Sequence, residues 1–556
     1  MPESRSKFLI PAVGSAIVVA GGIAAYMYFK GGPSGDISGV LSAAKVIPDE
    51  AVLATYISTE PKVWAKLEQF GTQEAQKIVA KSLEDLNKNL STDNSISYEK
   101  DLKPWVGGVM IAMLPSSSVK PVAQNTPQAV QEPKVLMVVG IKDKLAALNF
   151  ANKFKAQKGV KVQETDYKGE KIIETTGNGE QNYTAVLNTT HIVRSSHKQA
   201  VEHAIDTFKG EPSFASKEGV NSMLANGVNV DNTLAQIYVP DYGSMVKQIS
   251  ATPNTPIPPE TMKQLKQLKS MVAGVGIDNA GVRMKAVAKL DPAQVKYQYQ
   301  NTSAKVVSQF PADTIALMSG KGISNWWSAL VEQSKEAPEL KFTIEQTRAQ
   351  LKLVNLDLDK EIFGWMDGEF AFAAIPSNQG VLAQIGFGGA LVFHTSDRKT
   401  AQATLNKLDD FVKAQSVNVA KTSIGGKEIT EWQIPQQGAL LAHGWLDNNS
   451  VFVTFGGPIA QTLAERKGES LESSDNFKAT TSTLQRPNGG YFYLDMDKAV
   501  PLLNRFATAQ QQSITPEATA VISSIRGLGM TATSPDKTTT QVEMLLALKP
   551  KEGVRE

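Results

Sequence analysis

The side chains that most often carry out chemistry are sparse in this sequence. Cysteine is absent, which excludes thiol catalysis, disulfides and cysteine-bound metals. The sequence has 5 histidines, none in a His-Glu-x-x-His motif or four residues from another. His197 and His203 are six residues apart and would point to different sides of a helix. We therefore expect ordinary surface or strand histidines, and we predict no metal site, no cofactor and no catalytic residue.

One acidic triplet is similar to a calcium-binding loop. Asp357, Asp359 and Glu361 alternate as the first ligands of such a loop do. The loop also needs a glycine and a final glutamate, where this chain has Ile362 and Gly368. The triplet is better interpreted as a polar face or a cluster at a helix end.

Glycine and serine motifs give no enzyme signature. Gly386–Gly389 precedes a strand-like run, whereas phosphate loops follow a strand and open a helix. Gly320-Lys321-Gly322 lacks the spacing of a nucleotide-binding loop. No Gly-x-Ser-x-Gly elbow occurs, although a serine–lysine dyad has no pattern that would exclude it. The sequence thus favours a protein that is not an enzyme, with an envelope hydrolase as the least favoured alternative.

The tryptophans recur at matching places along the chain. Two pairs correspond: Trp64 with Trp327, and Trp105 with Trp365. Aromatic residues at equivalent positions are most often core residues, and an aromatic-lined groove is the alternative. Three tryptophans have no counterpart and are the better candidates for a groove: Trp326, Trp432 and Trp445.

The elements that would position these residues occur twice. Residues 43–57 and 304–318 share Ala-Lys-Val, then a proline, an acid and an apolar run. Asp101–Gly107 and Glu361–Gly368 each precede an apolar run that ends in a proline. Further matches follow in the same order, with a period of about 260 residues. The sequence therefore predicts a duplicated domain, with a boundary near residue 300.

Within each half the hydrophobic pattern predicts strands joined by tight turns, with a few helices between them. Strands are expected over 52–57, 106–114 and 135–141, and a helix over 198–208. Consecutive strands with short turns favour antiparallel pairing. We expect an α+β class, with two homologous domains of antiparallel sheet and helices packed on one face.

The N-terminal segment resembles a membrane anchor. Phe8 to Phe29 contains no charged residue, and a helix of that length rises about 33 Å, enough to cross a bilayer. Arg5 and Lys7 precede it, which predicts the N-terminus inside and the body outside. A cleaved signal peptide is the alternative, with Gly22-Ile23-Ala24 as a cleavage site.

These patterns together predict a domain plan for a single-pass, membrane-anchored protein. Its parts are a cytoplasmic N-terminus at 1–7, an anchor at 8–29, a flexible stalk at 30–41, a first repeat at 42–300 and a second at 301–552. Composition excludes a nucleic-acid partner, because 57 Lys and Arg are balanced by 55 Asp and Glu. Hydrophobic residues at 42% exclude a mainly disordered chain.

The opening AAKVIPDEAVLATYIST, the segment DLKPWVGG and the duplicated body resemble an uncharacterised, mainly cyanobacterial family of membrane-anchored proteins with a domain of unknown function. The resemblance implies a body in the periplasm or the thylakoid lumen, and it brings no assigned active site. We expect a non-catalytic protein that binds or helps to assemble an envelope or membrane protein. The alternative is a carrier of an apolar small molecule, such as a lipid or pigment, in a groove of the body.

Overall fold

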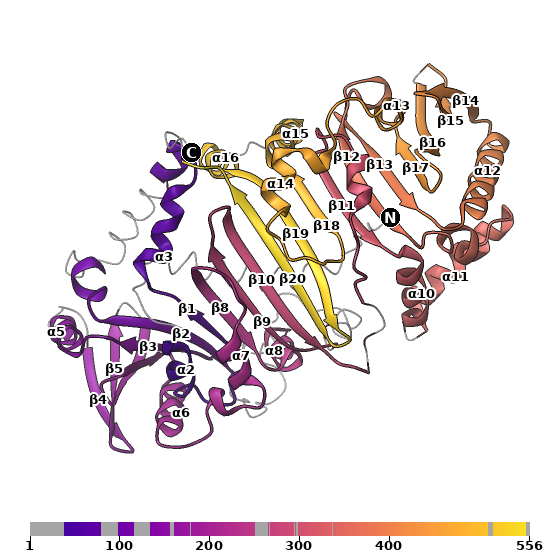
Figure 1. Ribbon diagram of the computed structural model, residues 1–556. Helices are drawn as coiled ribbons and strands as arrows, with labels where there is room; N and C mark the ends of the chain where they lie inside the picture. The colour runs from indigo at the N-terminus through magenta and orange to yellow at the C-terminus, as the bar shows by residue number, and fades with distance from the viewer. Residues whose placement is uncertain are drawn as a thin grey trace, which may run out of the picture. The chain divides into compact units, whose positions relative to one another are not determined.

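The structure is a computed structural model, and it divides into two compact units (Figure 1). It describes residues 38–78, 98–115, 134–155, 161–177, 180–250, 265, 267–293, 295, 298–335, 337–436, 438–509 and 515–551. The first unit runs to Asp291 and includes Lys551, and the second is Pro292–Pro550.

The first unit is built on an antiparallel sheet with the spatial order β4-β5-β6-β7-β3-β2-β1-β8-β9-β10. Its strands are β1 (Leu53–Ile57), β2 (Val106–Leu114), β3 (Lys134–Ile141), β4 (Lys161–Tyr167), β5 (Glu170–Gly177), β6 (Glu180–Leu187), β7 (His191–Ser195), β8 (Thr233–Val239), β9 (Leu268–Ile277) and β10 (Gly281–Leu290). Its helical segments are α2 (Ser38–Ala44), α3 (Pro61–Ala65), η1 (Lys66–Gln69), η2 (Tyr98–Leu102), α5 (Lys144–Lys155), α6 (Lys198–Phe208), η3 (Phe214–Ser216), α7 (Val220–Asn226) and α8 (Tyr242–Ser250).

The second unit has an antiparallel sheet with the order β14-β15-β16-β17-β13-β12-β11-β18-β19-β20. Its strands are β11 (Ala316–Lys321), β12 (Glu369–Pro376), β13 (Phe387–His394), β14 (Asn418–Ile424), β15 (Lys427–Ile434), β16 (Gly438–Trp445), β17 (Ser450–Phe455), β18 (Tyr491–Asp495), β19 (Ile525–Asp536) and β20 (Thr539–Leu548).

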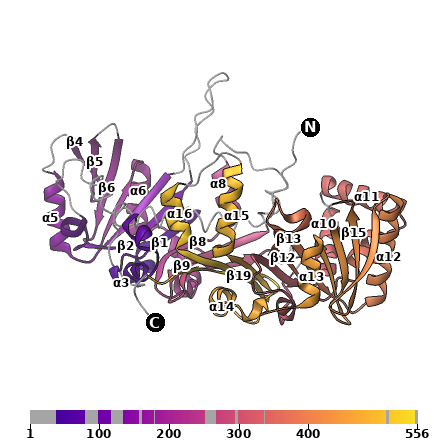
Figure 2. The ribbon, with the colours of Figure 1, turned by 90° about the horizontal axis from the view of Figure 1, so that it is seen from above.

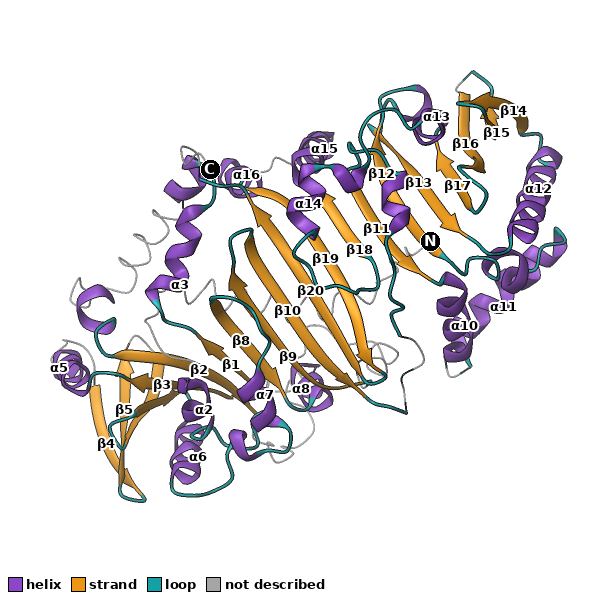
Figure 3. Cartoon of the chain, in the orientation of Figure 1, coloured by secondary structure: helices purple, strands orange, loops and turns teal. Residues whose placement is uncertain are grey.

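The helices of the second unit gather in groups around this sheet. They are η4 (Lys305–Gln309), α10 (Ile323–Ser334), α11 (Pro338–Leu353), η5 (Leu358–Phe363), η6 (Gly380–Leu382), α12 (Arg398–Ala414), α13 (Gly457–Glu465), η7 (Leu471–Ser473), α14 (Asp475–Thr481), α15 (Met496–Ala509) and α16 (Pro516–Ser523). Figure 3 shows α10, α11 and α12 close together, and all three contact η5. Figure 2 shows α15 and α16 on one side of β19 and α14 on the other.

The α+β class is confirmed, but the expected single helical face is wrong, because helices cover both faces of each sheet. In the first unit Met110 and Ala112 face the core beneath α2 and α6, whereas Val109 on the opposite face packs with Phe150 of α5. Strand β12 shows that both faces of the sheet are also covered in the second unit. Its phenylalanines Phe370 and Phe372 pack in the cluster that includes α12, and Ala371 and Ala373 are also buried. Successive residues of a strand point to opposite faces of the sheet, so a strand that is apolar at both odd and even positions must be covered on both faces.

The N-terminal transmembrane helix of the predicted fold is also corrected. Among the described residues, no helix is long and apolar enough to cross a membrane. A transmembrane helix is therefore not part of the fold that the structure describes, and the predicted segments 1–7 and 8–29 lie outside the described residues. The predicted stalk, 30–41, does not extend to its expected end, because α2 begins at Ser38 and Val40 is buried.

The two units share one pattern of strand pairing. Each pairing given above for β1–β10 has a counterpart ten strands later, for example β1 with β2 and β8, and β11 with β12 and β18. The bridge from Pro48 to Ser213 likewise corresponds to that from Pro311 to Ser470. The two units therefore share a topology, and common descent of the two halves stays a prediction from the sequence.

Candidate functional site

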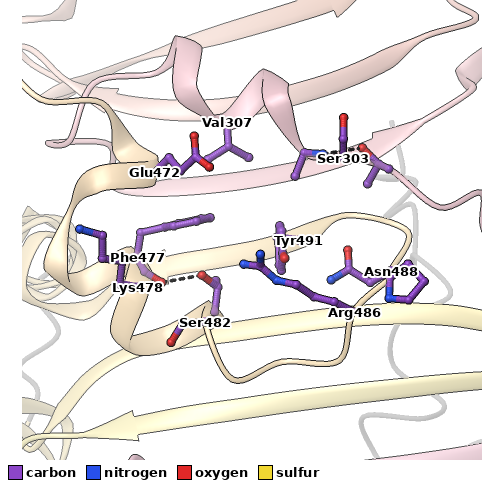
Figure 4. A pocket seen from close by; sticks show the side chains of 13 residues that line it. Ser303, Val307, Glu472, Phe477, Lys478, Ser482, Arg486, Asn488 and Tyr491 are labelled. Atoms are coloured by element: carbon purple, nitrogen blue, oxygen red, sulfur yellow. Dashed lines mark hydrogen bonds between the residues drawn. The ribbon is translucent and has the colours of Figure 1, made fainter.

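A pocket of about 620 Å³ lies in the second unit (Figure 4). Four segments line it: the start of the unit up to η4, the short helix η7, the helix α14, and the loop that leads into β18. Its lining residues are Thr302, Ser303, Ala304, Val307, Glu472, Phe477, Lys478, Thr481, Ser482, Arg486, Pro487, Asn488 and Tyr491. The size and the mixture of apolar and polar groups are typical of a small-molecule site.

Helix α14 forms one wall because two glycines let it approach the sheet. The hydroxyl of Ser474 accepts the N–H of Phe477 at 3.2 Å and caps the helix. A Cβ on Gly529 would lie 2.0 Å from the carbonyl oxygen of Thr480, and a Cβ on Gly527 would also clash with Thr480. The close contact turns Phe477 inward, where only 5% of its surface is exposed.

The wall formed by residues 302–307 is held by a buried carboxylate. Glu369, at the start of β12, is 9% exposed. Its Oε1 accepts the hydroxyl of Thr302 at 2.5 Å, and the N–H and hydroxyl of Ser303 at 2.8 and 2.7 Å. Its Oε2 accepts the N–H of Val306 at 3.2 Å. Burial favours the neutral acid, but these hydrogen bonds outweigh it and hold the pKa of Glu369 below its ordinary value.

The loop before β18 is fixed by Asn488, which is 3% exposed. Its side chain donates to the carbonyl of Gln485 at 2.8 Å and accepts the N–H of Gly490 at 3.0 Å. Its carbonyl accepts the N–H of Thr302 at 2.9 Å, which joins this loop to the first wall. The polar groups of Asn488 and Thr302 therefore hold the pocket together and are not offered to a ligand.

The polar groups that the fold leaves for a ligand are few. Arg486 lies with its guanidinium carbon 6.0 Å from the ring centre of Tyr491, and Figure 4 shows the two side by side. Lys478 and Glu472 lie toward one end of the pocket (Figure 4). Within the described part of the chain, none of these three charged residues forms an ion pair. The aromatic rings of Phe477 and Tyr491 meet edge to face at 5.9 Å and supply apolar surface.

A second polar cluster is buried and serves the fold. Asp409 of α12 accepts His443 Nε2 at 2.8 Å and Trp432 Nε1 at 2.7 Å. His443 is 3% exposed and Asp409 is 6% exposed. Burial opposes the charge on Asp409, but these two hydrogen bonds prevail and lower its pKa. Trp432, a predicted groove residue, is thus a partner in a closed cluster.

The acidic residues Asp357, Asp359 and Glu361 lie at the start of the short helix η5, which agrees with the predicted cluster at a helix end. Asp357 caps η5 by accepting the N–H groups of Asp359 and Lys360. Asp359 pairs with Arg348 at 2.9 Å, and Glu361 pairs with Lys407 at 2.5 Å. Among the described residues, no group of three or more potential ligands could hold a metal ion.

The other tryptophans divide between core and surface. Trp105 and Trp365 are buried, and each donates its indole N–H to the carbonyl four residues before it. Trp327 is 8% exposed and stacks on an aromatic ring of η5, whereas its neighbour Trp326 is 45% exposed. The core interpretation is confirmed for these three buried residues.

The remaining two tryptophans use their indole N–H groups in hydrogen bonds within the fold. The indole N–H of Trp64 donates to the carbonyl of Ser58 at 3.0 Å. Trp445 donates to Gln402 at 2.6 Å, and Arg398 stacks on its ring at 3.9 Å. None of the seven tryptophans, all within the described residues, lines the pocket.

Sequence reasoning missed every residue of the pocket. Arg486 and Tyr491 belong to no motif, and the segments 302–307 and 472–491 are far apart in the chain. One weak signal is the run Arg-Pro-Asn-Gly-Gly-Tyr at 486–491, which places an arginine in a turn before a strand.

The comparisons with known proteins concern family and fold. A search of curated proteins gives no match. Two crystal forms of TP0453, forms IV and I, match with TM-scores of 0.25 and identities of 11% and 9%. The matches cover 47% and 45% of this chain and 85% and 78% of the other chain. Residues 12–548 match the family described as protein of unknown function (DUF3352). The chain therefore belongs to that family.

Proposed function

We propose that this chain is a non-catalytic binding protein and that the pocket of its second unit takes up a small ligand. The proposal rests on a difference among the polar groups around the pocket: some are hydrogen-bonded within its wall, and others have no ion-pair partner among the described residues. Thr302, Ser303 and Asn488 are committed to the wall, whereas Arg486 and Lys478 have no ion-pair partner in the described part of the chain. A pocket whose walls are held by internal hydrogen bonds, and whose charged side chains have no ion-pair partner, is suited to binding a small ligand.

Catalysis fits these lining residues less well. A nucleophilic hydroxyl needs a base within hydrogen-bond reach. The hydroxyls of Thr302 and Ser303 donate to Glu369, whose depressed pKa makes it a weak base. The described lining residues include no histidine.

The test compares turnover with binding on the full chain. We expect no labelling by a fluorophosphonate and no hydrolysis of nitrophenyl esters or phosphates above the uncatalysed rate. We also expect ligand binding that is lost in Ser482→Trp, because the indole fills the pocket from an exposed lining position. Turnover that disappears on a single polar substitution in the pocket would refute the proposal.

The carrier of an apolar molecule is the second candidate, and a different surface favours it. Met318, Phe492, Met530 and Met544 form one row across the strands β11, β18, β19 and β20. Met318 is 43% exposed, and the other three are partly exposed. Flexible methionines suit an apolar ligand of irregular shape.

This candidate predicts that phenylnaphthylamine, a neutral fluorescent probe, binds the full chain. Met530→Lys should remove that binding, while Ser482→Trp in the pocket should leave it unchanged. If Met530→Lys has no effect, the sheet face is not the site.

The finer parts of the family resemblance are also proposals. We propose that the two units arose by duplication, and their matching pairings support this. A partner protein, a role in assembly and the cyanobacterial likeness stay predictions from the sequence.

A further inference from the structure

One polar group of the pocket is unpartnered although its side chain is buried. Tyr491 is 5% exposed, and its hydroxyl has no hydrogen-bond partner among the described residues. Two residues along the same strand, the hydroxyl of Tyr493 donates to Asp495 at 3.1 Å, as buried tyrosines usually do. The Tyr491 oxygen is not among the fully buried, unsatisfied atoms of the described residues, so solvent reaches it, and Tyr491 is one of the residues that line the pocket.

The charges beside this hydroxyl favour an anion. The guanidinium of Arg486 lies over the ring of Tyr491, and Lys478 adds a second cation to the lining. Glu472 is the single acid among the lining residues, and it is exposed. Behind the wall, the charge of Glu369 is already satisfied by donors from Thr302, Ser303 and Val306. A guanidinium and a phenol together donate to a carboxylate, sulfonate or phosphate.

The rest of the lining favours an organic group attached to that anion. Phe477 and Val307 are buried residues that present apolar atoms to the pocket, and Pro487 adds an apolar ring. Figure 4 shows Phe477 and Arg486 both extending toward the middle of the pocket. A volume of about 620 Å³ exceeds what a lone inorganic ion would fill.

We propose that the pocket selects an organic anion. Arg486 and the Tyr491 hydroxyl bind its charged oxygens, and its apolar part lies against Phe477. This inference rests on the proposed binding function and names the class of ligand for the same site.

The test uses two fluorescent probes that differ by one charged group. Anilinonaphthalene sulfonate carries the anion, and phenylnaphthylamine is its neutral counterpart. Both are titrated into the full chain, and hydrogen exchange of the peptides over 472–491 shows whether the pocket is protected. We expect the sulfonate to bind at least about tenfold more tightly in the pocket than the neutral probe.

Variants separate the anion contacts from the pocket as a whole. Arg486→Gln and Tyr491→Phe should each weaken sulfonate binding about tenfold and leave neutral-probe binding unchanged. Arg486 is exposed and Tyr491→Phe keeps the ring, so both variants should fold, which circular dichroism checks. Lys537→Gln, in the turn between β19 and β20, removes a charge elsewhere and should change nothing.

The outcomes distinguish this inference from the proposed function. If both probes bind equally and Ser482→Trp removes both, the pocket binds ligands but does not select anions, and only the inference fails. If neither probe protects residues 472–491, the inference and the proposed function fail together. If inorganic phosphate alone displaces the sulfonate at equal concentration, the organic part of the inference is wrong.

Discussion

The substitution Glu369→Gln tests how the pocket wall is held. The carboxylate accepts hydrogen bonds from Thr302, Ser303 and Val306. A glutamine oxygen can keep the bonds to Thr302 and Ser303 but loses their charge assistance, about 1 kcal/mol for each bond. Its NH₂ group would face the N–H of Val306 and leave that donor unpaired, at about 1–3 kcal/mol. Relief from burying a charge offsets part of this loss, so we expect a net destabilisation of about 2–4 kcal/mol at neutral pH.

The depressed pKa of Glu369 gives this prediction a pH dependence. A carboxylate whose pKa is lower in the folded state stabilises the fold above its unfolded pKa, about 4.3. That contribution is lost as the pH falls through the folded pKa. The wild type should therefore lose its advantage over Glu369→Gln as the pH is lowered below about 4.3.

Urea unfolding followed by hydrogen exchange and mass spectrometry gives the free energy of unfolding for peptides of each unit separately. Peptides of the second unit should show the loss, and those of the first should not. Glu472→Gln, at an exposed position of the pocket, is the matched control and should be neutral. An effect of Glu369→Gln below about 0.5 kcal/mol, or one that does not shrink in acid, would refute the reasoning.

Three further predictions compare neighbouring or contrasting positions by the same unfolding assay. Trp327→Ala should cost about 3–5 kcal/mol because a stacked, buried ring is lost, whereas Trp326→Ala should cost less than about 1 kcal/mol; equal effects would contradict the burial of the first. Asp409→Asn should cost about 2–4 kcal/mol, since the amide oxygen can still accept but the buried hydrogen bonds from His443 and Trp432 lose their charged acceptor, while exposed Asp410→Asn stays within about 0.5 kcal/mol; a neutral Asp409→Asn would show that the charge of Asp409 does not hold this cluster. Gly490→Ala should cost at least about 2 kcal/mol, because its φ is +119° and a Cβ would lie 2.1 Å from a backbone oxygen; a stable variant would contradict this loop geometry.

Local patterns predicted the elements of the sheet well. The helix expected over 198–208 is α6, with the same bounds, and the strand expected over 106–114 is β2. The strand expected over 135–141 lies within β3. These segments have strong periodicity or turn residues, and such signals lie within the segments themselves.

The number of helical faces was predicted wrongly because one feature of the strands was overlooked. Residues 370–376 of β12 read Phe-Ala-Phe-Ala-Ala-Ile-Pro, with apolar residues at both parities. A strand with one solvated face would alternate apolar and polar residues. The uninterrupted apolar run was therefore evidence for helices on both faces.

The pocket could not be assembled from local patterns. Arg486 becomes a binding candidate only because it lines the same pocket as Thr302 and Phe477, and only packing between segments far apart in the chain brings Thr302 to this pocket. The hydroxyl of Tyr491 is distinguished from that of Tyr493 by its missing partner, which requires coordinates to see.

The most direct test of the proposed binding function is a native mass spectrum of the full chain after incubation with a small-molecule extract of its source cells. The wild type should carry extra mass that is lost on denaturation. Ser328→Trp, on α10, which contributes no residue to the pocket, should carry the same mass, and Ser482→Trp should carry none. A wild type that stays bare, or a Ser482→Trp variant that keeps the added mass, would contradict a ligand in this pocket.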